Sequence, residues 1–145
     1  MLTDSEKADM QREAGGLLHF LPRRHLECYC IDPDAIAAFI ISKHLASAEI
    51  VTPAAVESAL RSAAGEGPLL IAEWNNDISK EDWLAGVDAA KLIKDVCGTL
   101  SDQRVPFMKK DDSLFLLRHM LTHNPTRLTP LKEYVESLVK AVSPT

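Results

Sequence analysis

Apolar residues recur at helical spacing along most of the chain, and capping signals mark where the helices begin. Asp32-Pro33, Thr52-Pro53 and Thr129-Pro130 each place a capping side chain before a proline at the first helical position. Thr3-Asp4-Ser5-Glu6 is a capping box, which predicts a helix that runs to Gly15-Gly16. These signals predict a chain built mainly of helices.

The apolar faces of the predicted helices indicate how they pack. The helix after Asp32 is apolar almost all round, so we expect it at the centre of the core, with Ile36, Phe39 and Ile40 buried. Their expected partners lie on a helix that opens at Asp112 or Ser113 and closes near Asn124, and on the last helix. These expected partners are Leu117, Leu121, Leu131 and Leu138. A further helix is predicted from Ser79, with one apolar stripe running from Trp83 to Val96.

Strand signals are few. Residues 17–21 give the best candidate, residues 105–108 are demoted by Pro106, and residues 68–74 fit either a strand or a buried helix. The sequence therefore predicts a mainly α fold over residues 1–145. We expect one small helical domain of about five to seven helices, with at most a short strand near residues 17–21.

Composition changes this picture little. The chain has 145 residues, 46% hydrophobic and 26% charged, with a net charge of −5 and three cysteines. These values, the polar N-terminus and the lack of a long apolar run predict a soluble cytoplasmic protein with no membrane segment. Residues 65–102 carry three basic and eight acidic residues, and residues 103–145 carry seven basic and four acidic. This contrast indicates either two ordinary solvated faces or a weakly basic surface around Lys109, Lys110, Arg118 and Arg127.

Metal-ligand and nucleophile patterns are weak. His25-x-x-Cys28-x-Cys30 lacks the two separated ligand pairs of a structural zinc site, even with Cys97 added, so buried thiols are the expected role. His119 and His123 have the i, i+4 spacing of a metal pair but lack the glutamate of the zincins, and a solvated helix edge is the expected role. The chain has no phosphate-binding glycine loop and no Gly-x-Ser-x-Gly motif. We therefore expect no autonomous hydrolase or nucleotide-binding enzyme.

The most distinctive segment is residues 17–40, in which a short predicted strand leads into Arg23-Arg24-His25-Leu26-Glu27, then Tyr29 and the capped helix at Asp32. If this turn is helical, Arg24 and Glu27 can pair as a hydrogen-bonded clasp, and we expect both to be partly buried. The clasp either holds the first core helix in place or lines a cleft that meets a metal or a nucleic acid.

This segment resembles the stretch that follows the TOPRIM-type nuclease core in OLD-family and related ATPase-linked proteins, many of which act in DNA transactions or phage defence. The positions that match the family pattern are Arg24, Glu27, Tyr29, Asp32, Pro33, Ala35 and Ile36. Asp4-Ser5-Glu6 is similar to a TOPRIM metal-binding D-x-D, with Glu6 in place of the second aspartate. Lys91-Leu92-Ile93 is similar to a further conserved stretch, with Ala90 in place of its glycine.

The resemblance implies a non-catalytic helical module or split subunit related to the C-terminal region of those proteins, without the nuclease strands and the ATPase. It implies an ATPase subunit or another protein as partner, weak contact with a nucleic-acid backbone, no cofactor, and a homodimer as a further option. The expected binding residues are Arg23, Arg24, Glu27, Tyr29, Lys109 and Lys110.

The alternative is a metal-dependent nuclease fragment or subunit. In that case Asp4 and Glu6 bind Mg²⁺ or Mn²⁺, and Glu27 and Lys91 complete the catalytic site.

Overall fold

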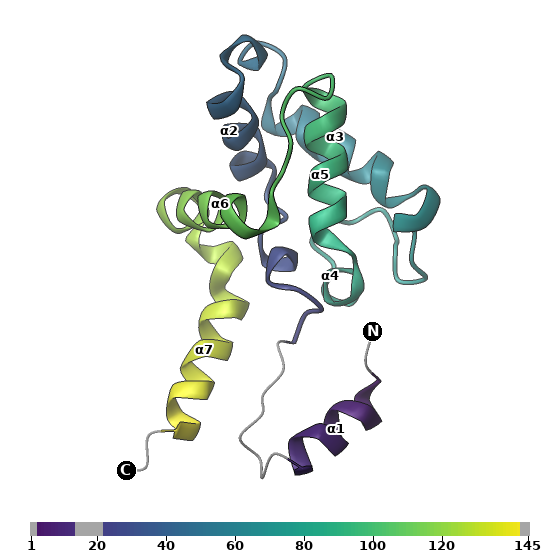
Figure 1. The fold of residues 1–145 in the computed structure, drawn as a ribbon, viewed down its shortest axis with the longest axis vertical. Coiled ribbons are helices and arrows are strands. Elements are labelled where there is room, and N and C mark those ends of the chain that lie inside the picture. Colours follow the sequence, from purple (N-terminus) through teal and green to yellow (C-terminus); the bar gives the residue numbers. More distant parts are fainter. Residues whose placement is uncertain (1–2, 14–21, 143–145) are drawn as a thin grey trace.

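The computed structural model describes residues 3–13 and 22–142 (Figure 1). The α-helices within these ranges are α1 (Asp4–Glu13), α2 (Pro33–Lys43), α3 (Pro53–Ala64), α4 (Glu81–Gly86), α5 (Ala89–Leu100), α6 (Lys109–His123) and α7 (Thr129–Val142). Short 3-10 turns lie between them, namely η1 (Leu26–Tyr29), η2 (Leu45–Ser47), η3 (Gly67–Leu69) and η4 (Pro125–Leu128). The mainly α fold is confirmed, and the described residues contain no strand; residues 17–21 lie outside them.

Most of the predicted helix starts are confirmed by their capping hydrogen bonds. In the capping box, Glu6 N–H donates to Thr3 Oγ1 at 3.1 Å and Thr3 N–H donates to Glu6 Oε2 at 2.8 Å. Asp32 and Thr52 accept from the backbone amides two and three residues on. Thr129 differs, because it already has helical backbone angles (φ −54°, ψ −45°) and η4 leads directly into α7.

The single helix predicted from Ser79 is wrong, because the chain breaks at Val87-Asp88. Val87 is extended (φ −69°, ψ 146°), and the Asp88 carboxylate accepts from the Lys91 N–H at 3.4 Å as a new N-cap. The apolar stripe from Trp83 to Val96 continues across Val87-Asp88, so the spacing of apolar residues alone does not reveal the break between α4 and α5. Asp88 followed by two alanines was the available signal.

Helix α6 begins three or four residues earlier than predicted and buries a different face. Its start is fixed by Asp112, whose carboxylate accepts from the Met108 N–H at 2.6 Å. The buried positions are Ser113, Leu116 and Met120, whereas Leu121 is exposed. Apolar residues occur on both faces of this helix, so packing against α2 decides which face is buried.

The two other strand candidates form irregular backbone. Residues 68–74 contain the end of η3 followed by turns, so neither the strand nor the buried helix is correct. Residues 105–108 carry no secondary structure before α6 begins, but Val105 and Phe107 are buried, as alternate positions of an extended segment can be.

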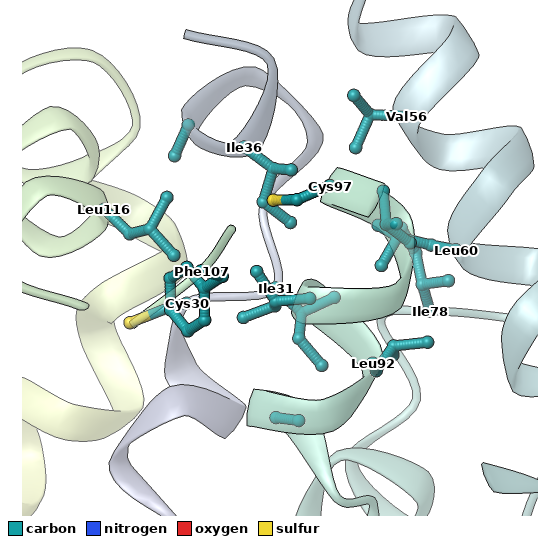
Figure 2. Packing of buried hydrophobic residues seen from close by; sticks show 14 of the residues in the cluster. Cys30, Ile31, Ile36, Val56, Leu60, Ile78, Leu92, Cys97, Phe107 and Leu116 are labelled. Carbon is teal, nitrogen blue, oxygen red and sulfur yellow. The ribbon is translucent and has the colours of Figure 1, made fainter. Parts of the chain in front are cut away.

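The core forms around α2, which packs on both α3 and α6, while α3 also packs on α5. Ile36, Phe39 and Ile40 are fully buried, which confirms the central position of this helix. The Phe39 ring packs edge to face on the rings of Phe107 and Phe115, with ring centroids 5.7 and 5.6 Å away. Figure 2 shows side chains from α2, α3, α5 and α6 gathered in one cluster. Of the partners predicted for this helix, Leu117 and Leu131 lie against the core.

Helix α7 leads away from this core in Figure 1 and contacts it mainly through η4 at its N-terminal end. Throughout the described ranges, every helix is too short or too polar to cross a lipid bilayer.

Candidate functional site

The turn that carries the distinctive motif separates the two neighbouring arginines. The Arg24 N–H donates to the Ala85 carbonyl at 2.7 Å, which fixes this segment against the end of α4. The Arg23 side chain is buried and the Arg24 side chain is exposed. The prediction that Arg24 is partly buried is wrong: Arg23 is buried in its place, because the backbone at His25 is extended rather than helical (φ −137°, ψ 157°).

Every nitrogen of the Arg23 guanidinium has a partner. Nε and Nη2 donate to the two carboxylate oxygens of Glu81 at 3.2 and 2.7 Å, and Nη1 donates to the Cys28 carbonyl at 3.0 Å. The guanidinium carbon lies 4.5 Å from the centre of the Tyr29 ring, a cation–π contact. Burial raises the pKa of Tyr29. These contacts tie the motif to the first residue of α4.

A cavity of about 260 Å³ lies beside this ion pair, at the start of η4 and α7. Arg23, Tyr29 and Glu81 line it together with Arg127. Arg127 Nε lies 3.5 Å from an oxygen of the buried Asp32. Since both arginines already face carboxylates, the arrangement balances its own charge and holds elements together.

Glu27 lies on the other side of the turn and is buried. The Ser113 hydroxyl lies 3.1 Å from Glu27 Oε1 and 2.7 Å from the Lys109 carbonyl, and these two acceptors share its single proton. Lys109 Nζ lies 3.8 Å from Glu27 Oε2, which accepts no hydrogen bond. Glu27 therefore contacts α6 and not Arg24, whose Nη1 donates instead to the Gly86 carbonyl at 3.4 Å. The expected pairing of Arg24 with Glu27 is wrong, because Arg24 is exposed and the side-chain partners of both residues lie far along the chain.

A small basic cluster covers Glu27. The pKa of His25 is lowered chiefly by burial and further by the charges of Lys109 and Arg24, while Asp88 and Glu27 act in the opposite direction. The charges of Lys109 and Arg24 both act on His25, and the exposed Lys110 follows Lys109 in the chain. We call Arg24, His25, Lys109 and Lys110 the basic cluster. It can contact a phosphate or a carboxylate through exposed side chains.

The residues of the nuclease alternative have separate roles in this structure. Glu6 caps α1, Glu27 faces Ser113 and Lys109, and Lys91 lies in the first turn of α5. Asp4 is the first residue of α1. Across residues 3–13 and 22–142, no group of three or more His, Cys, Asp or Glu residues is placed to bind a metal ion.

The cysteines are buried free thiols, as predicted. Cys28 Sγ donates to the Val87 carbonyl at 3.4 Å, and Cys30 and Cys97 are fully buried. Burial raises the pKa of Cys28, and it raises the pKa of Cys30 and of Cys97 to about 12. Thiols held in this form are poor ligands and poor nucleophiles at neutral pH.

Sequence reasoning missed the acidic partners that organise this region. Glu81 and Asp32 each pair with an arginine far away in the chain, and Asn124 Nδ2 donates to both Asp32 and Asp34, at 3.1 and 2.8 Å. No local spacing identifies such pairs. The only signal was the position of Asn124 at the end of a predicted helix.

Comparisons of the chain with protein-family models, with curated proteins and with solved structures find no match.

Proposed function

We propose that the chain is a non-catalytic helical interaction module that binds a protein partner through α7. The observation that carries this proposal is the exposed apolar strip of that helix. Val135 and Val139 are 49% and 54% exposed, and Tyr134 and Leu138 beside them are half-exposed. We call these four residues the α7 strip.

Because the α7 strip is left uncovered by the core, its apolar residues are available to contact a partner. The helix is held to the core near its N-terminal end, where Leu131 lies against the core, while the strip continues beyond that contact. Beside the strip the helix carries polar residues, among them Lys132 and Glu136, which form an i, i+4 ion pair at 4.0 Å. An amphipathic helix that leaves its apolar side uncovered typically docks into an apolar groove on another protein.

The partner that fits best is an ATPase-bearing protein, because the resemblance to the region after the nuclease core of OLD-family proteins implies one. In this proposal the chain is a split subunit for DNA transactions, and the basic cluster adds weak, salt-dependent contact with a nucleic-acid backbone.

The direct test is site-specific photo-crosslinking in the source cells. A photoreactive amino acid at Val135 should capture one protein that the same group at Leu45, 78% exposed on η2, does not capture. The purified partner should then bind the chain, and Val139→Asp should weaken binding at least tenfold. Ser137→Asp is the matched control, since Ser137 is exposed on the same helix outside the α7 strip. Capture only of a second copy of the chain would contradict the proposed partner.

The nuclease alternative is tested on the same protein. We expect no plasmid nicking and no single-strand cleavage with Mg²⁺ or Mn²⁺, because Glu6 and Glu27 already have structural partners. Metal-dependent cleavage that an Asp4→Ala/Glu6→Ala variant abolishes would overturn the proposal in favour of the nuclease.

A further inference from the structure

We propose that His119 and His123, in the last turns of α6, form a binding site for a divalent cation of the zinc class. The proposal is independent of the α7 strip and of the nuclease residues. It rests on the geometry of the two imidazoles, on their place at the end of the helix and on the cavity that they line.

The geometry of the pair suits one metal ion. The two residues lie four positions apart on the same face, and their ring centres are 4.3 Å apart with the planes tilted by 36°. Two imidazoles that bind one tetrahedral zinc at the usual Zn–N length hold their ring centres about 5 Å apart. His123 is exposed, so its ring can turn about its side-chain bonds toward that arrangement.

The two rings have nitrogen atoms available for a metal. His119 is half-buried, and its Nδ1 is buried without a hydrogen-bond partner. Neither ring makes a hydrogen bond within the described residues, so binding a cation displaces no protein partner. Neutral imidazole is a preferred ligand of zinc, copper and nickel.

The surroundings favour positive charge. Both histidines line a mostly apolar cavity of about 340 Å³, in which the one acidic residue among those described is Asp34, whose carboxylate also accepts a hydrogen bond from Asn124. The pair lies at the C-terminal end of α6, where the partial negative charge of the helix attracts cations. On the other side of the pair, a second cavity is lined by Lys43 and Arg118 and by Asp111 and Asp112, so the charges there cancel.

The site supplies two protein ligands and leaves the other positions open. The described residues contain no third His, Cys, Asp or Glu close enough to complete a metal group. A cation held here keeps water molecules or takes a ligand from another molecule, as zinc does in sites with an open position. The site is therefore one of moderate affinity that accepts an outside ligand.

The test uses the full chain without an affinity tag, titrated with Zn²⁺ by calorimetry and by thermal unfolding, with Mg²⁺ in parallel. We expect one Zn²⁺ per chain, a rise in the melting temperature with Zn²⁺ but not with Mg²⁺, and shifts of the His119 and His123 ring signals in NMR spectra. His123→Ala should weaken Zn²⁺ binding about 100-fold, because the second linked ligand is lost. His123 is exposed, so this variant should keep its helical circular dichroism.

His44→Ala is the matched control, because it removes a histidine whose ring lies 3.5 Å from Arg104 and which lines neither of the two cavities at the pair. It should bind Zn²⁺ like the unaltered chain. The proposal is overturned if His123→Ala binds Zn²⁺ as tightly as the unaltered chain or if His44→Ala loses the binding.

Discussion

Arg23 and Glu81 stand 58 residues apart in the chain and form an ion pair in which one partner is buried and the other is not. Two hydrogen bonds join them, and the exposed fractions of their side chains are 7% and 59%. The pair joins the motif before η1 to the first turn of α4. This asymmetry means that removing the exposed partner leaves a buried charge, whereas removing the buried partner leaves an exposed one.

The first prediction follows from that asymmetry. Glu81→Ala should destabilise the fold by about 2–3 kcal/mol, although Glu81 is exposed, because the buried Arg23 guanidinium keeps only the Cys28 carbonyl as a hydrogen-bond acceptor. Asp82→Ala is the matched control, since Asp82 is exposed in the same helical turn, and it should cost about 0.5 kcal/mol. Urea unfolding of both variants measures the difference. Equal effects would show that the ion pair carries no special role.

The neighbouring arginines give a second matched pair. Arg23→Ala should cost about 2 kcal/mol through lost hydrogen bonds and lost packing on Tyr29, and Arg24→Ala less than about 0.5 kcal/mol. The measurement is the free energy of unfolding from urea titration. A larger loss for Arg24→Ala would contradict the separation of the two side chains by the extended turn.

Sequence analysis identified this motif as important but could not assign its partners. Spacing of three residues pointed to Arg24 and Glu27 as a local pair, which holds only if the turn is helical. The structure instead pairs Arg23 with Glu81 and Glu27 with Ser113 and Lys109, contacts that depend on how distant elements pack. Capping chemistry is local, so the starts of α1, α2 and α3 were predictable. The face that α6 buries was not, because both of its faces carry apolar residues.

A third prediction concerns the contact between Glu27 and α6. Ser113→Ala should cost about 1 kcal/mol, because it removes the hydroxyl whose proton is shared between Glu27 Oε1 and the Lys109 carbonyl, and leaves a buried carboxylate with only the Lys109 ion pair. Ser137→Ala removes a hydroxyl that bonds only to its own helix on an exposed face, and should cost less than about 0.5 kcal/mol. If the two variants unfold at the same urea concentration, Glu27 does not depend on the Ser113 hydroxyl.

A fourth prediction compares two helix caps of the same kind in different surroundings. Thr52→Ala should cost about 1 kcal/mol, the usual loss for an exposed N-cap. Asp32→Ala should cost about 2–3 kcal/mol, because the buried Asp32 also accepts from Asn124 and faces Arg127. A double-mutant cycle between Asp32 and Asn124 separates the cap from the contact with η4. A coupling energy near zero would contradict the second role of Asp32.

The last prediction concerns the buried thiols and alkaline pH. Burial raises the pKa of Cys30 and Cys97 to about 12, from an ordinary value of 9.0 that the unfolded chain retains. Between these two values the unfolded chain loses its thiol protons while the folded chain keeps them, so the folded state binds more protons and its stability falls as pH rises. We expect stability to be independent of these thiols below about pH 8 and to decrease above pH 9, by at most about 1.4 kcal/mol per pH unit for each thiol. Urea unfolding at pH 7, 9 and 10 measures this for the unaltered chain and for Cys97→Ala, which should show a shallower decrease. Identical slopes in the two proteins would contradict the raised pKa of Cys97. Between pH 7 and pH 10, an aromatic disulfide reagent should react with Cys97 only after unfolding. The folded chain keeps this sulfur both protonated and fully buried.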